Sequence, residues 1–210
     1  DGNKAAEEMT GYKKEELISI LRHNGTILLA DEMYWQLEYG READPTPMCD
    51  YYEKAVSLSG LSKSYGLPGL RIGWLATRTP QLLQKAAELK DYTTICNSAP
   101  SEFLGLIAVE NSSRLVDRCR NIIAANLRLV EQLVQRYPEN LEYLPGGGGS
   151  ILFPRFIDGR SAEKVSRQLI EQHNLLILPG PLFDMPDQYF RMGLGRASLP
   201  TALSKFEEIL

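Results

Sequence analysis

The chain has 210 residues, of which 43% are hydrophobic, and a formal net charge of −4. This length and composition suit one large or two small domains with a substantial core, and the charge excludes a broad basic surface for nucleic acid. Because no apolar run approaches the ~18 residues of a membrane span and no signal-like segment is seen, a cytoplasmic protein without membrane contact is expected. Three widely spaced cysteines predict reduced thiols, with neither disulfides nor a metal site.

The first half of the chain alternates between helical and strand-like segments, as a doubly wound α/β sheet does. A helix is predicted over 13–23, where Asn24 and Gly25 end it. A short apolar run over 26–30 predicts a buried parallel strand that leads into Asp31. The other elements expected in this half are strands over 55–58 and 70–76, a helix over 80–90, a polar connector over 92–98 and a helix over 100–109.

A long helix is predicted in the middle of the chain, because apolar residues recur at helical spacing over 114–137. A helix of this length spans about 36 Å, which is enough to connect two domains. The boundary is predicted inside it, between a partial large domain over 1–120 and a small α+β domain over 121–210. The small domain is expected to contain strands over 141–144, 151–156 and 175–178, a strand around Arg191, and helices over 161–172 and 201–210.

The segment from Ser59 to Gly73 reads SGLSKSYGLPGLRIG and places one lysine in a Ser/Gly turn, followed by one arginine. The amine of Lys63 can form a Schiff base with an aldehyde where burial or nearby positive charge favours the neutral amine. Arg71 can supply that charge and can bind a phosphate with its planar guanidinium. The glycines allow the backbone to approach a ligand closely. The structural alternative is a surface lysine and a helix-pairing arginine in a Gly-rich loop.

Two further charged residues stand at positions where ligands bind. Asp31 follows the predicted strand over 26–30, at the carboxyl edge where ligands of open α/β sheets gather. A carboxylate there can bind a ligand, although an aspartate at a strand end is also a common turn former or helix cap. Arg191 lies within a strand-like run, where a charge is costly unless it meets an anion. That anion is either a ligand or a structural Asp or Glu.

The lysine segment resembles the lysine motif of the class I/II aminotransferases, fold type I enzymes that use pyridoxal 5'-phosphate. The family pattern reads roughly S/G-x-S-K-x-x-G-x-x-G-x-R-x-G, and every defining position is filled in this chain. The resemblance implies an α/β fold, namely the C-terminal part of the fold type I large domain, with a mixed, mostly parallel sheet, followed by a small α+β domain. It also implies a homodimer.

The resemblance further implies a transaminase that acts on an amino acid and a 2-oxo acid through a Schiff base at Lys63. It assigns the pyridine nitrogen to Asp31, the ring oxygen to the phenol of Tyr34, the phosphate to Arg71 and the substrate α-carboxylate to Arg191. The same set of residues also serves lyases, cyclases and amino-acid oxidases. Aminotransferase-like domains also act as non-catalytic ligand sensors in transcription regulators, so both alternatives stay open.

The chain departs from the family pattern near its start. The family's glycine-bearing phosphate loop and the aromatic residue that stacks on the pyridine ring have no counterpart, and Glu8 stands where an asparagine is expected to contact the ring oxygen. The chain is therefore expected to be a fragment, about the C-terminal half of a full enzyme, that is inactive by itself. The alternative is a protein that has lost its N-terminal half together with its activity.

Overall fold

The computed structural model describes residues 7, 9–38, 46–144 and 146–210, so Glu8 lies outside the described residues. The chain divides into two units, residues 1–117 (unit 1) and 118–210 (unit 2). The division falls within helix α6 (Ser112–Arg136), which begins in unit 1 and ends in unit 2. The assignment of residues 1–120 to a cofactor-binding domain and of 121–210 to a small domain stays a prediction.

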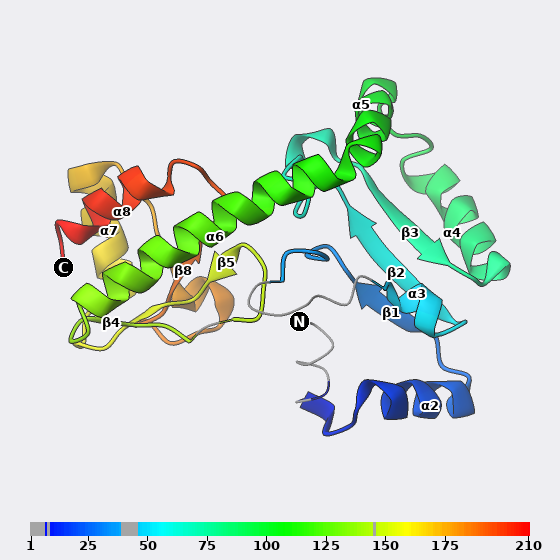
Figure 1. Ribbon diagram of the computed structural model, residues 1–210, viewed down its shortest axis with the longest axis horizontal. Coiled ribbons are helices and arrows are strands. Elements are labelled where there is room, and N and C mark those ends of the chain that lie inside the picture. Colours follow the sequence, from blue (N-terminus) through cyan, green and yellow to red (C-terminus); the bar gives the residue numbers. More distant parts are fainter. Residues whose placement is uncertain (1–6, 8, 39–45, 145) are drawn as a thin grey trace. The chain divides into compact units, whose positions relative to one another are not determined.

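Unit 1 is built on a three-stranded sheet in the order β1-β2-β3 (Figure 1). β1 (Leu28–Asp31) pairs in parallel with β2 (Ala55–Gly60), and β2 pairs antiparallel with β3 (Gly73–Thr77). The central strand β2 is the most buried of the three, because both of its edges are paired. Because β1 and β2 run in parallel, their carboxyl ends lie at the same edge of the sheet.

Helices and one 3₁₀ turn connect and cover these strands. α2 ends where Gly25 adopts a left-handed φ of 63°, a conformation that costs glycine little. Tyr52, which is buried, ties α2 to the strand that follows, because its hydroxyl donates to the carbonyls of Thr26 (2.6 Å) and Leu21 (3.1 Å). The helical elements that lie wholly within unit 1 are α2 (Lys14–Asn24), α3 (Met48–Tyr51), η1 (Pro68–Leu70), α4 (Pro80–Thr93) and α5 (Ala99–Glu110).

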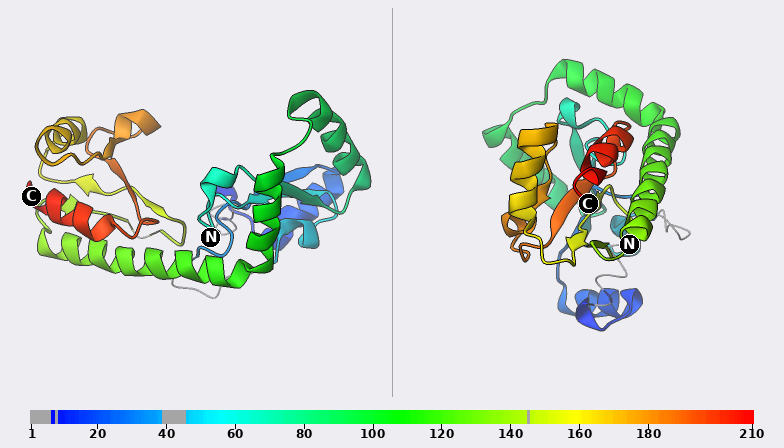
Figure 2. Two further views of the ribbon diagram at one scale, coloured as in Figure 1. Left: turned by 90° about the horizontal axis from the view of Figure 1, so that it is seen from above. Right: turned by 90° about the vertical axis from the view of Figure 1, so that its left-hand side faces the viewer.

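Unit 2 contains two small antiparallel sheets, with strand orders β4-β6 and β5-β8-β7. The side chains of Phe156, Phe190 and Phe206 form its aromatic core, with ring centroids 4.8 to 6.2 Å apart. Figure 2 shows α8 alongside the unit 2 part of α6. The elements of unit 2 are β4 (Leu141–Glu142), β5 (Ile151–Leu152), β6 (Arg155–Phe156), α7 (Ala162–His173), β7 (Leu178–Pro179), η2 (Gly180–Phe183), β8 (Phe190–Gly193) and α8 (Leu199–Glu207).

Several predicted strands are shorter in the structure than their sequence pattern indicated: the strand predicted over 141–144 is only β4, and of the one predicted over 175–178 only Leu178 lies in β7. The strand predicted over 70–76 begins only at Gly73, because Leu70 ends the η1 turn and Arg71 has a φ of 55°, which an extended strand cannot contain. The strand predicted over 151–156 is divided into β5 and β6. Pro154, which lies between them, has no N–H to donate to a strand ladder.

The described helices include none that is long and apolar enough to cross a membrane. Within the same residues, no group of three or more His, Cys, Asp or Glu side chains is placed to hold a metal ion.

Candidate functional site

The first part of the candidate site is the turn that follows β1. Pairing between β1 and β2 extends one residue beyond the strand, since the Glu32 N–H donates to the Leu58 carbonyl at 2.8 Å. Asp31 Oδ1 accepts from the Met33 N–H at 3.1 Å, so one carboxylate oxygen stabilises the turn. The Asp31 side chain is exposed, and among the described residues no cation pairs with it.

The second part is the lysine turn that follows β2. The Leu61 N–H donates to the Ile72 carbonyl and the Gly66 N–H to the Lys63 carbonyl, both at 3.0 Å, which closes the turn. Leu61 is fully buried, whereas Lys63 is exposed. The Lys63 amine lies 5.4 Å from the centre of the Tyr34 ring. The structure therefore brings two of the predicted site residues together, one from the turn after each parallel strand.

Tyr65 anchors the lysine turn to the rest of unit 1. Its side chain is 6% exposed and its ring meets that of Trp74 edge-on, with the centroids 6.2 Å apart. The Ser112 hydroxyl at the start of α6 donates to the Tyr65 hydroxyl at 3.1 Å. These contacts fix the backbone two residues from Lys63 while the lysine side chain remains accessible.

Two of the four glycines in this segment are needed because the backbone of a neighbouring segment of the protein lies close to them. A Cβ at Gly60 would lie 2.9 Å from the Ile72 carbonyl oxygen, and a Cβ at Gly73 would lie 3.0 Å from the Ser59 carbonyl oxygen. Gly60 and Gly73 therefore allow β2 and β3 to approach each other. The sequence pattern had instead suggested that these glycines allow the close approach of a ligand. Gly66 has a left-handed φ of 67°, which its turn requires.

Arg71 follows the η1 turn and is exposed. Its Nη1 donates to the Pro68 carbonyl at 3.1 Å. The guanidinium has five N–H donors, so the others take no part in this hydrogen bond. No carboxylate of the described residues forms an ion pair with Arg71. Its side chain therefore retains donors for an anion.

Arg191 lies in unit 2, in the middle of β8, and is half-buried. Its guanidinium carbon lies 5.4 Å from the centre of the Phe183 ring, and that ring in turn meets Phe153 edge-on. The structural alternative for Arg191 was a salt bridge to an Asp or Glu, and none is formed with the part of the chain that the structure describes. The aromatic contact holds the side chain and leaves its charge without a counter-ion there.

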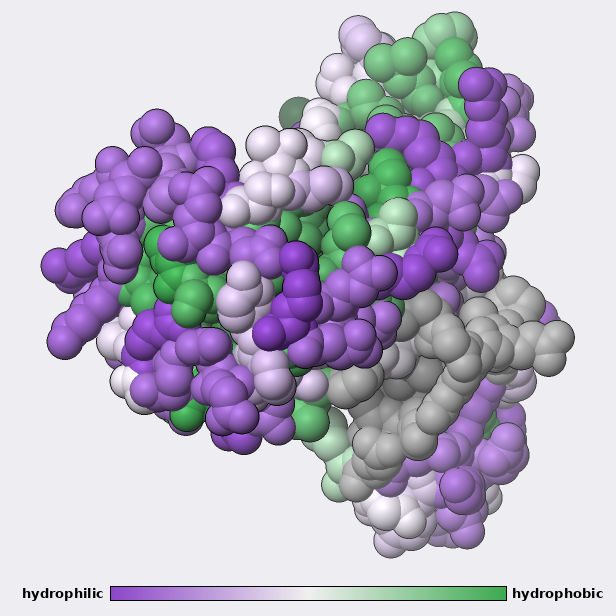
Figure 3. All heavy atoms as spheres, turned by 60° about the vertical axis from the view of Figure 1, so that its left-hand side comes forward, coloured by the Kyte–Doolittle hydropathy of each residue, from purple (hydrophilic) through white to green (hydrophobic). Residues whose placement is uncertain are grey.

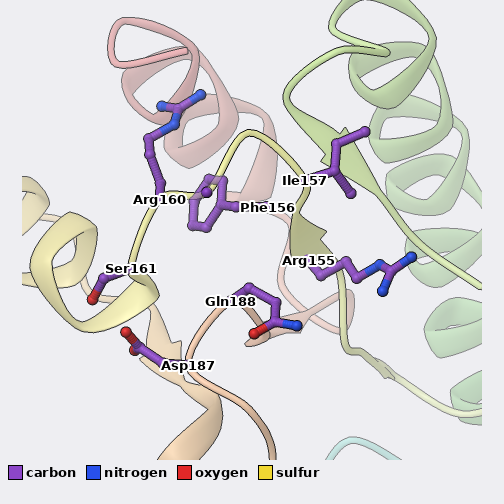
Figure 4. Close-up of a pocket in the computed structure, with 8 residues that line it drawn as sticks. Arg155, Phe156, Ile157, Arg160, Ser161, Asp187 and Gln188 are labelled. Atoms are coloured by element: carbon purple, nitrogen blue, oxygen red, sulfur yellow. The ribbon is translucent and has the colours of Figure 1, made fainter.

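An open pocket of about 480 Å³ in unit 2 contains none of the predicted site residues (Figure 4). Its charged groups are engaged by the protein: Arg155 pairs with Glu142, and Arg160 with Asp158. Hydrogen bonds from Arg160, and then from Asn140, hold the pKa of Asp158 at about 2. This pocket is therefore separate from the candidate site. It is lined by Arg155, Phe156, Ile157, Gly159, Arg160, Ser161, Asp187 and Gln188.

The sequence of the chain matches the family "aminotransferase class I and II" over residues 9–205. The chain belongs to this family. Capreomycidine synthase from Streptomyces vinaceus is 28% identical over 200 residues, which are 94% of this chain and 50% of that protein. A pyridoxal-phosphate-dependent aminotransferase from Streptococcus suis has a similar structure, with a TM-score of 0.82 and 29% identity over 93% of this chain and 51% of its own. The pyridoxal-phosphate-dependent cyclase OrfR gives a TM-score of 0.79 at 26% identity, over 92% of this chain and 52% of its own.

These similarities confirm the fold class predicted from the sequence and indicate pyridoxal phosphate as the cofactor. The chain spans about half the length of the relatives that it matches. The residues of unit 1 suit this cofactor chemically, because they offer an accessible amine at Lys63, a phenol at Tyr34, a carboxylate at Asp31 and, at Arg71, a guanidinium that pairs with no carboxylate of the described residues.

Sequence reasoning passed over Ser64, which is buried beside Lys63 and donates to the Trp35 carbonyl at 2.5 Å. A serine in a Ser/Gly turn is usually a simple turn former. Its contact partner lies about thirty residues earlier in the chain, so no local sequence pattern indicates this contact.

Proposed function

We propose that this chain forms the lysine-bearing part of a pyridoxal-phosphate-dependent aminotransferase, which transfers the amino group of an amino acid to a 2-oxo acid. The observation that carries the proposal is the position of the Lys63 amine, 5.4 Å from the Tyr34 ring. These two residues belong to the turns that follow β2 and β1, at the carboxyl edge of a parallel strand pair, where α/β proteins bind ligands.

Each residue of unit 1 has a distinct role in this proposal. Lys63 would hold pyridoxal phosphate through its amine, and the cofactor, when bound, would supply an electron-withdrawing ring. The Lys63 amine would take the substrate α-proton and later return it. The Asp31 carboxylate keeps the pyridine nitrogen protonated, the Tyr34 phenol donates to the ring oxygen, and Arg71 binds the phosphate.

Arg191 of unit 2 binds the α-carboxylate of the substrate in this proposal. Its lack of a carboxylate partner among the described residues supports this role, because a half-buried guanidinium gains most from a bidentate anion. The α-carboxylate is common to all amino acids, so Arg191 orients the substrate without selecting its side chain. The cytoplasmic location inferred from composition stays a prediction.

The proposal also includes assembly of the protein as a homodimer. Apolar side chains on α5 are exposed, among them Phe103 (65%), Leu106 (58%) and Val109 (49%). The upper part of Figure 3, where α5 lies, shows hydrophobic side chains gathered at the surface. Contiguous exposed apolar residues are typical of association surfaces, which supports assembly through this helix. Light scattering of the protein that contains this chain tests the proposal, and a monomer would contradict it.

A cyclase is the alternative that one of the similar solved structures supports. The pyridoxal-phosphate-dependent cyclase OrfR is 26% identical to this chain with a TM-score of 0.79, against 29% and 0.82 for the aminotransferase from Streptococcus suis. A cyclase and a transaminase share the lysine, the ring partners and the proton transfer, and they differ in what happens to the substrate side chain. Product analysis separates them: a new amino acid from the 2-oxo acid supports transamination, and a cyclised, ammonia-releasing or oxygen-consuming reaction supports the alternatives.

The assignment of Lys63 is tested by reduction with borohydride in the presence of pyridoxal phosphate. The protein that contains this chain should retain the cofactor on the peptide with Lys63, and Lys63→Ala should abolish both attachment and turnover. Lys85→Ala, which alters an exposed lysine on α4, is the matched control and should change neither. Attachment to another lysine in the unaltered protein would refute the assignment. The 210-residue chain alone is expected to bind the cofactor weakly or not at all.

A further inference from the structure

Side-chain hydroxyls connect the two site turns where the backbone pairing of β1 and β2 has ended. The last backbone bond between these segments joins the Glu32 N–H to the Leu58 carbonyl. Beyond it, the Ser59 hydroxyl contacts the Glu32 carbonyl at 3.4 Å, and the Ser64 hydroxyl donates to the Trp35 carbonyl at 2.5 Å. Of these contacts, the one made by Ser64 lies furthest along the turn after β1.

The Ser64 hydroxyl contacts the carbonyls on both sides of Tyr34. It lies 2.5 Å from the Trp35 oxygen and 3.3 Å from the Met33 oxygen. Ser64 is 4% exposed and directly follows Lys63 in the chain. A buried hydroxyl that bonds to backbone atoms cannot move without leaving those atoms unsatisfied. The contact thus joins the backbone of Tyr34 to that of Lys63.

We propose that Ser64 is a positioning residue, which sets the placement of the Tyr34 phenol relative to the Lys63 amine. The inference rests on the proposed function, because it concerns the two groups that face the cofactor. The Lys63 side chain is exposed and long, so its distance from Tyr34 depends on how the two turns are held together. Proton transfer and hydrogen bonding to a ring oxygen need heavy atoms within about 2.6–3.2 Å, so a small shift of either turn alters both.

Ser166 provides a matched control for the loss of a buried hydroxyl. It lies in α7 of unit 2, is 5% exposed, and donates to the Ile177 carbonyl at 2.7 Å. Ser64→Ala and Ser166→Ala each remove one buried bond from a serine to a backbone carbonyl, so similar losses of stability are expected. Only Ser64→Ala should alter the site.

The experiment is a double-mutant cycle on the cofactor-loaded protein that contains this chain. Ser64→Ala, Tyr34→Phe, the double variant and Ser166→Ala are compared by the pH midpoint of the cofactor's visible absorption band and by turnover. Ser64→Ala should move the midpoint in the same direction as Tyr34→Phe and lower kcat by up to about 100-fold. In the Tyr34→Phe background, Ser64→Ala should add little, because residues that act through one another are not additive. Ser166→Ala should leave the midpoint unchanged.

Two outcomes would overturn the inference and leave the proposed function standing. One is a midpoint in Ser64→Ala that equals that of Ser166→Ala, and the other is a full additional shift in the double variant, both with Lys63 still labelled by borohydride. Failure to label Lys63 in the unaltered protein would refute the proposed function and this inference together. If Ser64→Ala does not fold, Ser64→Cys, which keeps a similar volume and weakens the donor, must shift the midpoint in the same direction.

Discussion

Gly60→Ala is expected to destabilise unit 1 where β2 leads into the lysine turn. The added Cβ would lie 2.9 Å from the Ile72 carbonyl oxygen and 3.0 Å from the Gly73 Cα. Both are backbone atoms of the neighbouring segment, so they cannot rotate away as a flexible side chain would. Overpacking of this kind costs roughly 1–3 kcal/mol, and the smaller entropy of the unfolded alanine chain offsets about 0.4–1 kcal/mol. The expected net loss in the free energy of unfolding lies between about 0 and 2.6 kcal/mol.

Gly69→Ala is the matched control, because a Cβ at Gly69 has no atom within 4 Å and its φ lies outside the left-handed region. It should leave stability unchanged or raise it by up to about 1 kcal/mol. Urea unfolding followed by tryptophan fluorescence measures both variants, and Trp74 in β3 lies close to the altered contact. Equal urea midpoints for Gly60→Ala and Gly69→Ala would refute the close approach of β2 and β3 as the reason for Gly60.

Two further predictions concern unit 2. The pKa of Asp158 is lowered from 3.8 to about 2, chiefly by the hydrogen bond from Arg160, so its contribution to stability is complete above about pH 4 and is lost as the pH falls toward 2. Asp158→Asn should therefore flatten this part of a stability–pH profile, and an unchanged slope would contradict the assignment. Arg191→Gln should raise KM for an amino acid about 10- to 100-fold. It should shift the urea midpoint no more than Arg128→Gln, which alters an exposed arginine and serves as the control. An unchanged KM would argue against carboxylate binding by Arg191.

Much of the fold could be predicted because its signals are local. The helix over 13–23 was expected from its pattern and from Gly25, and α2 ends there because glycine adopts the left-handed conformation easily. The long helix over 114–137 corresponds to α6, since one apolar face at helical spacing requires a helix whatever it packs against. The family was recognisable from the lysine segment, because the motif is a spacing of residue types within one stretch of chain.

The boundaries of strands were less predictable, because strands depend on partners elsewhere in the chain. The run over 70–76 looks like a continuous strand, yet its first residues form a 3₁₀ turn and Arg71 takes a left-handed φ. Only residues from Gly73 onward face a partner on β2. Pairing that is absent from the local sequence decides where such a strand begins.

The sequence by itself predicted the class of chemistry, because a lysine, an aspartate at a strand end and two arginines are identities that folding does not change. Only the tertiary structure decided how these groups are held. It placed the Lys63 amine 5.4 Å from the Tyr34 ring, left Asp31 exposed, and assigned Gly60 to the contact between β2 and β3. These properties arise between segments far apart in the chain, where parallel pairing and buried hydroxyls bring them together, and no local pattern encodes them.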